Sequence, residues 1–99
     1  MSDRQINPTQ LKLSANQIKA LAHPLRLSIL LFIDKNKSVN VNKIYNTLKL
    51  EQSITSQHLK ILRTAGIVNY QREGKLIFYS VNYNKVKRIV DLVNDFVNR

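Results

Sequence analysis

The chain has 99 residues, enough for one domain with a small core that gains stability when further surface is buried in an oligomer. Sixteen lysines and arginines against six aspartates and glutamates give a formal charge of +10, which favours an anionic partner such as nucleic acid. The chain has no cysteine, which excludes disulfides, thiolate metal sites and thiol redox sensing, and no apolar run long enough to span a bilayer.

The distribution of charge and the amino-terminal residues bear on a membrane-surface role and on the location of the protein. Between Lys35 and Lys75 there are eight cations and two acids, so the positive excess is not confined to a basic tail. A membrane-surface role would place cations beside an apolar helical face, whereas the helical faces here are better explained by a core. The first residues lack the apolar segment of a signal peptide, and we therefore expect a cytoplasmic protein.

The first predicted helix spans much of residues 8–22. Asn7 is suited to cap it, and Pro8 to occupy its first position. Ser14 and Gln17 repeat the capping-box spacing inside this stretch, so a break near Ser14 is one expectation. Residues 1–7 are expected to be flexible.

His23-Pro24 separates this helix from the next one, because proline disfavours helix in the residue before it and fits a first helical turn. A second helix should therefore cover residues 24–34, followed by a polar loop over residues 35–38. The inner side of this helix is predicted to consist of Leu27, Leu30 and Leu31, widened by Ile29, Phe32 and Ile33.

Two short helices separated by a tight polar turn come next. Residues 41–48 follow a cap at Asn40 and carry one apolar stripe, made of Val41, Ile44, Tyr45 and Leu48. The turn at residues 49–52 leads into a helix over residues 53–64, which Gln52 or Ser53 is placed to cap. The buried face of this helix is predicted to be Thr55, Leu59 and Leu62, and Gly66 ends it in a left-handed conformation.

The opposite side of that second helix presents small hydroxyls, an amide and cations, and no carboxylate, when residues are placed at about 100° per step. Such a face suits base edges and phosphates, so helix-turn-helix is the natural interpretation, with a solvated helix of an ordinary bundle as the alternative. Ile54 either meets a thymine methyl or packs under the following hairpin. The predicted DNA-binding residues here are Gln52, Ser53, Ser56, Gln57, Lys60 and Arg63.

From residue 67 to residue 81 the apolar period becomes that of a strand. A two-stranded hairpin is predicted around a turn containing Glu73-Gly74, with Val68, Tyr70, Leu76 and Phe78 alternating with Asn69, Gln71, Ile77 and Tyr79. Arg72 and Lys75 are expected at the tip of the hairpin, where cations reach phosphates or the minor groove. A solvated turn is the alternative.

The last predicted helix covers residues 84–98 and is amphipathic over four turns. Its apolar side chains recur at steps of three and one: Val86, Ile89, Val90, Val93, Phe96 and Val97. This helix either caps the core of its own chain or meets a partner. In so small a chain little core is left for it to cover.

Three stretches in register resemble the ArsR/SmtB family of bacterial winged-helix transcriptional repressors. The longest runs from residue 47 to residue 68 and contains Ser56-Gln57-His58-Leu59 and Arg63-Thr64-Ala65-Gly66. The second is residues 20–30, and the third is Arg72-Glu73-Gly74-Lys75 leading into residues 78–81. Together they cover most of the chain between residues 19 and 81.

The resemblance implies a homodimer whose interface is formed by the first and last helices, and a double-stranded DNA operator as its partner. The six apolar residues of the last helix would then be interface residues. Arg26 matches an arginine usual in the family, and we expect it to make a salt bridge or carbonyl contact in its own chain rather than a DNA contact.

The resemblance also implies two kinds of metal site in members that sense metals, and this chain matches neither. At the place of a Cys-x-Cys pair it has Asn40-Val41-Asn42, and amides are poor ligands for soft metals. At the place of an Asp-x-His on the final helix, Asp91 is followed two residues later by Val93, with no histidine after His58. We predict no metal site and no cofactor, and a helix-terminus or packing role for His23 and His58.

The sequence therefore predicts a single mainly α winged helix-turn-helix domain over residues 1–99, with about five helices and a two-stranded wing, acting as a dimeric DNA-binding repressor. An enzyme is not expected, because no paired carboxylates, nucleophile elbow or glycine-rich phosphate loop is present. One alternative is a winged-helix protein-interaction module that binds no DNA. Another is an RNA-binding domain, which is less favoured because the sequence shows no exposed aromatic residues clustered on a sheet. The operator, the regulated genes and the effector are not encoded in any of these patterns.

Overall fold

A computed structural model describes residues 6–98, and within them the chain forms five helices and three strands. The order is α1 (Pro8–Leu21), α2 (Pro24–Asn36), β1 (Val39–Asn40), α3 (Val41–Leu48), α4 (Gln52–Thr64), β2 (Val68–Glu73), β3 (Leu76–Val81) and α5 (Tyr83–Val97). This is the winged helix-turn-helix architecture that the sequence predicts.

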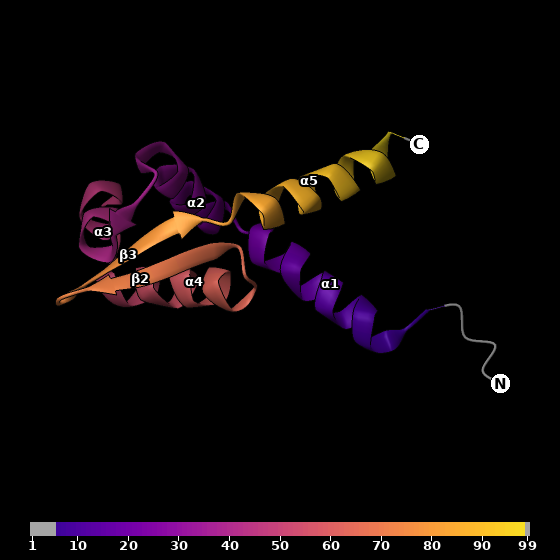
Figure 1. The fold of residues 1–99 in the computed structure, drawn as a ribbon, viewed down its shortest axis with the longest axis horizontal. Coiled ribbons are helices and arrows are strands. Elements are labelled where there is room, and N and C mark those ends of the chain that lie inside the picture. Colours follow the sequence, from indigo (N-terminus) through magenta and orange to yellow (C-terminus); the bar gives the residue numbers. More distant parts are fainter. Residues whose placement is uncertain (1–5, 99) are drawn as a thin grey trace.

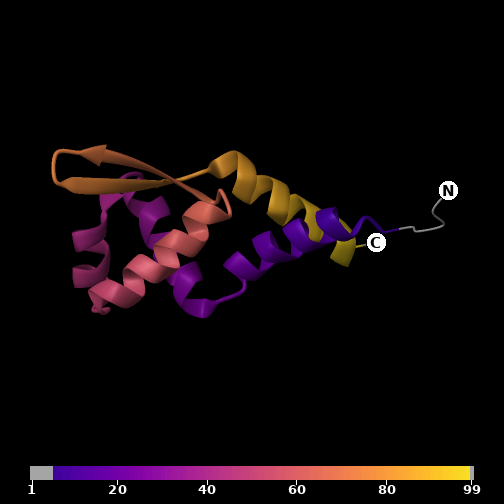
Figure 2. The same cartoon turned by 90° about the horizontal axis from the view of Figure 1, so that it is seen from below.

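The molecule divides into a packed body and two projecting helices. Residues 24–81, which we call the winged body, gather at one end, and α1 and α5, which we call the arms, leave it towards the other end (Figure 1). The view turned by 90° shows both arms extending to the same side of the winged body, so that the two ends of the chain lie at the same end of the molecule (Figure 2). The radius of gyration is 15.7 Å, above the value of about 13 Å expected of a compact domain of 100 residues.

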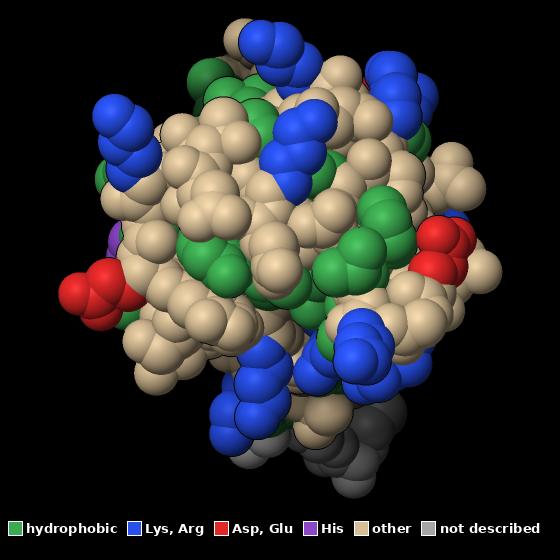
Figure 3. All heavy atoms as spheres, turned by 90° about the vertical axis from the view of Figure 1, so that its left-hand side faces the viewer, with side chains coloured by type: hydrophobic (Ala, Val, Ile, Leu, Met, Phe, Trp, Pro, Cys, Tyr) green, Lys and Arg blue, Asp and Glu red, His purple; other side chains and the backbone are tan. Residues whose placement is uncertain are grey.

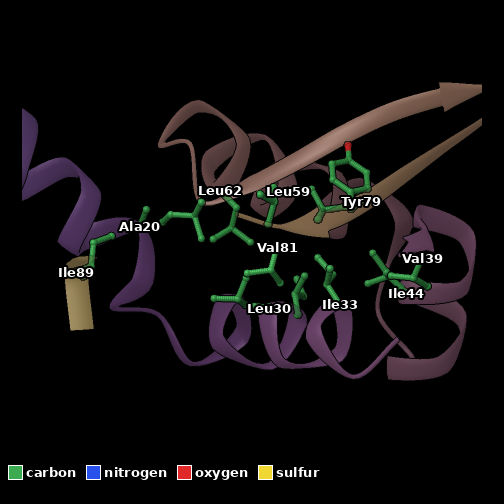
Figure 4. Packing of buried hydrophobic residues seen from close by; sticks show 13 residues of the cluster. Ala20, Leu30, Ile33, Val39, Ile44, Leu59, Leu62, Tyr79, Val81 and Ile89 are labelled. Atoms are coloured by element: carbon green, nitrogen blue, oxygen red, sulfur yellow. The ribbon is translucent and has the colours of Figure 1, made fainter. Parts of the chain in front are cut away.

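The core lies between α2, α4 and the sheet. Figure 4 shows Leu30 and Ile33 of α2 pointing towards Leu62 of α4 and Val81 of β3, with Ala20 and Ile89 extending the cluster to the roots of the arms. The apolar side chains with no exposed surface come from α2, α3, α4 and the segment after it: Ile29, Ile33, Ile44, Leu59, Leu62 and Ile67. The winged body therefore completes its own core.

The sheet has three antiparallel strands in the order β1-β3-β2, one strand more than the predicted hairpin. The added strand is the two-residue β1, in which Val39 pairs with Tyr79. Two residues are too few to produce an alternating pattern, and the pairing partner lies forty residues further along the chain, so no local signal marks this strand.

The prediction for the inner face of α2 was correct for Leu30, Ile29 and Ile33 and wrong for Leu27 and Leu31. Leu31 is 67% exposed and Leu27 is also exposed, while the buried stripe consists of Arg26, Ile29, Leu30 and Ile33. Apolar side chains surround α2 almost completely, so the apolar pattern does not define its phase. The buried residues follow steps of three, one and three, but the first of them is an arginine, and a pattern of apolar residues does not include it.

The strand phase in β3 was also assigned incorrectly. Tyr79 lies opposite Tyr70 and Val81 lies opposite Val68, so these residues share a face of the hairpin. Tyr79 and Val81 are buried, whereas Phe78 is only half-buried. A two-residue turn at Gly74-Lys75, rather than a longer one, sets this register, and Gly74 has the positive φ of 63° that such a turn requires.

Several helix ends differ from the predictions. Helix α1 continues through Ser14 without the expected break. Its cap is Asn7, as predicted, since Asn7 Oδ1 accepts hydrogen bonds from the amides of Thr9 and Gln10. Helix α2 continues to Asn36, and α5 begins at Tyr83 after a cap at Asn82. The expected flexibility of residues 1–7 falls largely on residues 1–5, which lie outside the described residues.

Candidate nucleic-acid interface

The turn between α3 and α4 is built by local backbone chemistry. Asn40 caps α3 as predicted, because its Oδ1 accepts a hydrogen bond of 2.9 Å from the amide of Lys43. Lys49 ends α3 in the left-handed conformation, with φ of 56°, and the amide of Leu50 donates to the Tyr45 carbonyl across this end. The half-buried Leu50 then anchors the turn against the core.

The start of α4 differs from the predicted capping. The N-cap residue is Glu51, which makes no side-chain cap hydrogen bond, and neither Gln52 nor Ser53 caps the helix. The buried hydroxyl of Thr55 instead donates to the Glu51 carbonyl at 2.9 Å. This bond satisfies the one polar group on the buried face, which otherwise consists of Leu59 and Leu62, as predicted.

The side of α4 that faces away from the core is exposed over its whole length. Its exposed residues include five of the six residues predicted to contact DNA: Gln52, Ser53, Ser56, Gln57 and Lys60. The first turn of α4 contains no acidic residue, and the helix has no carboxylate anywhere. Viewed from the end formed by α3 and the hairpin tip, the surface carries several Lys and Arg side chains, with acidic side chains only at its edges (Figure 3).

Arg63, the sixth predicted residue, has a different environment. It is half-buried, and its guanidinium carbon lies 4.6 Å from the centroid of the Tyr70 ring on β2. This cation–π contact joins the end of α4 to the hairpin. Burial raises the pKa of the neighbouring Tyr79 phenol above its usual range, although the charge of Arg63 opposes the shift, so Tyr79 is neutral at physiological pH.

The basic residues of the hairpin lie close to its end but not in equivalent positions. Lys75 is in the two-residue turn, whereas Arg72 is in β2 and pairs with Ile77 of β3. Both are exposed. The hairpin follows α4 directly and therefore has the connectivity of a wing.

A buried arginine joins α1, α2 and α4. Arg26 Nε donates to the Ala20 carbonyl at 2.6 Å, and one terminal nitrogen donates to the Lys19 carbonyl at 3.1 Å. The other terminal nitrogen lies 3.2 Å from Nδ1 of His58. The prediction that Arg26 contacts carbonyls of its own chain is confirmed.

The two histidines lie next to each other, which sequence reasoning did not foresee. Their ring centroids are 4.8 Å apart, and His23 Nδ1 accepts a hydrogen bond from the Leu25 amide at the start of α2. Burial lowers the pKa of His58, and the positive charges of His23 and Arg26 lower it further. The residues are 35 positions apart, so only the packing of α4 on the start of α2 reveals the pair.

The residues at the positions of the family's two kinds of metal site make other contacts in this chain. Asn40 is a helix cap, and Asp91 forms an ion pair of 2.8 Å with Lys87. Within residues 6–98 no group of three or more His, Cys, Asp or Glu side chains is close enough to hold a metal ion. Over the same residues, no helix has the length and apolar character needed to cross a membrane.

The arms carry the residues predicted to form a dimer interface. Ile89 is buried and Val86 half-buried, but the residues further along α5 are exposed, with Phe96 reaching 82%. A groove of about 270 Å³ runs between the arms near their roots. It is lined by Ile18 and Leu21 of α1, by the following Ala22, and by Ile89, Val90, Val93 and Asn94 of α5.

A helix-turn-helix whose second helix leads into a β-hairpin places the chain in the winged-helix class. The family model described as "Bacterial regulatory protein, arsR family" matches residues 23–70. Among similar proteins, the transcriptional repressor PagR of Bacillus anthracis is 40% identical over 92 residues, which cover 93% of this chain and 92% of PagR. The chain belongs to the ArsR family of bacterial regulatory proteins.

Two solved structures and one further relative extend the comparison. The crystal structure of PagR has a TM-score of 0.70 and covers 89% of this chain and 100% of that chain. The structure of NolR from Sinorhizobium fredii is 29% identical, has a TM-score of 0.75, and covers 94% of this chain and 95% of that chain. The transcriptional activator HlyU of Vibrio cholerae is 36% identical over 77 residues, which cover 78% of this chain and 70% of HlyU.

Proposed function

We propose that this chain is a homodimeric repressor that reads a double-stranded DNA operator with α4 and contacts phosphates with the wing, without a metal cofactor. The observation that carries the proposal is the face of α4. Thr55, Leu59 and Leu62 are fully buried, which fixes the rotation of the helix, so that Ser53 and Gln57 point to solvent on a face free of carboxylates.

The chemistry of this face matches DNA. Gln57 can form paired hydrogen bonds with adenine, small hydroxyls accept or donate to several base edges, and Lys60 suits a phosphate or guanine. The wing adds Arg72 and Lys75, whose charges bind phosphates without regard to sequence. Arg63 contributes mainly by holding the wing against α4 through Tyr70, which is 4.6 Å away.

The proposed assembly rests on the arms. A single copy leaves Val90, Val93, Phe96 and Val97 exposed on one side of α5, beside an apolar groove to which α1 contributes. A second copy of the chain covers such a surface symmetrically and presents two α4 helices to two half-sites. We propose repression rather than activation because PagR, named a repressor, is similar to almost the whole chain, although HlyU is named an activator.

Selection of bound duplexes from a random pool tests the DNA-reading proposal. We expect one enriched sequence with two similar halves. Gln57→Ala and Ser53→Ala should each reduce discrimination between that sequence and random DNA by about 1 to 3 kcal/mol. The matched controls are Gln10→Ala on α1 and Ser28→Ala on α2, which remove the same groups from exposed positions elsewhere.

Two results would contradict the proposal. If no duplex is enriched while the protein is folded, the winged helix serves protein interaction instead. If the α4 variants discriminate as well as their controls, another surface reads the DNA. Expression from a promoter that carries the selected sequence then distinguishes repression from activation.

A further inference from the structure

A second cleft, distinct from the groove between the arms, lies between α1 and α4. It has a volume of about 600 Å³, which is within the range of small-molecule sites. Helix α1 contributes Leu13, Asn16, Gln17, Lys19 and Ala20, α4 contributes Lys60, Ile61 and Thr64, and Arg26 and Ala65 complete the lining.

The charge in this cleft is of one sign. Arg26, Lys19 and Lys60 all line it, and none of the five acidic residues within residues 6–98 does so. Leu13, Ile61 and Ala65 supply apolar surface alongside these cations. A cleft that combines apolar surface with several cations favours a molecule that has an apolar body and an anionic end.

Arg26 provides the strongest argument for an anion. It is buried, yet within residues 6–98 it makes no ion pair. Its hydrogen bonds go to two carbonyls at the end of α1 and to His58, so that only dipoles compensate its charge. These contacts use three of the five N–H groups of a guanidinium. A buried cation is ordinarily paired with an anion, because dipoles replace only part of the hydration it loses.

The cleft shares no lining residue with the groove between the arms. That groove uses Ile18 and Leu21 of α1 and the following Ala22, and none of these residues lines the cleft. Ile18 and Ala20 are two residues apart, which places their side chains about 200° apart around the helix. The two sites face largely different sides of α1, and they adjoin where Gln17 of the cleft lies one turn from Leu21 of the groove.

We propose that this cleft binds a small amphipathic carboxylate, with its anionic end towards Arg26 and Lys19 and its apolar body against Leu13 and Ile61, and that binding alters DNA affinity. The coupling rests on the proposed function of α4, because the cleft shares Lys60, Ile61 and Thr64 with that helix. The ligand would also contact α1, one of the two arms. It can thus change the position of α4 relative to the dimer interface.

Octanoate, with octanol as the neutral probe of equal chain length, tests the binding step without DNA. Amide NMR signals of Ala20, Ile61 and Ala65 should shift saturably with octanoate, and octanol should bind at least tenfold more weakly. Because Arg26 joins three helices, its substitution can unfold the chain, so Lys19→Glu is used instead. It should weaken octanoate binding about tenfold, whereas Lys12→Glu, the same charge change elsewhere on α1, should change it less than twofold.

Asn16→Trp provides a second variant, since an indole at this exposed lining position fills the cleft and should abolish octanoate binding without disturbing the core. Equal binding of octanol, shifts confined to Ile18, Val90 and Val93, or no saturable shift would each overturn the proposed site.

The coupling is measured with the selected operator at constant ionic strength, because sodium octanoate also adds salt. A change of at least fivefold in operator affinity at saturating octanoate, absent in Asn16→Trp, is the expected result. Saturable binding in the cleft with unchanged operator affinity would overturn the effector role. If the protein binds no DNA sequence at all, the proposed function fails, and the NMR result on the cleft stands separately.

Discussion

The winged body buries its apolar residues within one chain, whereas the arms leave many of theirs exposed. In the body, Leu59 and Leu62 have no exposed surface, and α4, which carries them, packs against β2 and other helices of the same chain. On α5, Leu92 is 70% and Phe96 82% exposed, although the helix is as strongly amphipathic as α3. The body thus obtains its stability within one chain, and the arms carry apolar surface that this chain does not cover.

The largest effect is expected where a charge is placed on the arms. Val93→Glu introduces a carboxylate into the apolar face of α5, where burial against a partner would leave it unpaired. We expect a monomer by analytical ultracentrifugation and a loss of operator affinity of about 10²- to 10⁴-fold, because two linked half-site contacts become independent. The control is Asp91→Glu on the same helix, which retains the charge present in the parent.

A parent chain that sediments as a monomer at micromolar concentration would contradict this prediction. The exposed apolar face of α5 would then have a role other than contact with a second copy of the chain.

Truncating a core side chain of the winged body should lower its stability whether or not the chain forms a dimer. Leu59→Ala removes a fully buried side chain and should lower the free energy of unfolding by about 2 to 5 kcal/mol, through lost burial and the cavity left behind. Leu31→Ala, the same change at a position 67% exposed on α2, should cost less than about 0.5 kcal/mol. Urea unfolding measures both, and similar losses would mean that Leu31 is covered in solution.

The same contrast explains which parts of the fold could be predicted from the sequence. Helices α3 and α4 have one narrow apolar stripe each, and so Ile44, Thr55, Leu59 and Leu62 were placed correctly on buried faces. Helix α2 is apolar on most sides, and its buried face includes Arg26, whose hydrogen bonds to α1 carbonyls no apolar pattern contains. Local signals predict an element well when one face of it alone is apolar.

The candidate site could be predicted only in part for a related reason. The exposed residues of α4 follow from helix geometry once its buried face is known, and the structure places five of the six on the open surface. The stacking of Arg63 on Tyr70 and the meeting of His58 with Arg26 depend on how distant elements pack. Neither contact has a spacing in the sequence that marks it.

The third prediction compares cations on the body with a cation on the arms. Arg72→Ala and Lys75→Ala should each weaken binding to all DNA sequences alike and flatten the slope of log affinity against log salt by about 0.9. Lys12→Ala on α1 removes the same charge but should leave the slope unchanged. A uniform response of all three would show that total charge, rather than the position of the wing, governs binding.

The smallest effect is expected at the joint between the body and α1, where His58 of α4 meets Arg26. Burial first, and then the charges of His23 and Arg26, lower the pKa of His58 below its usual 6.5. The unfolded chain therefore takes up a proton at a higher pH than the folded chain does. Stability is retained in full above about pH 6.5 and is lost as the pH falls through the lowered folded pKa.

His58→Gln should remove this dependence, because glutamine does not titrate and its Oε1 can still accept a hydrogen bond from Arg26. Urea unfolding at pH 7.5 and 5.5 is the measurement, in a window above the range where most carboxylates titrate. We expect the parent to lose more stability than the variant between these values. The difference should be modest, since His58 is only half-buried and water screens its charge. Equal losses in both proteins would show that the folded chain does not lower the pKa of His58.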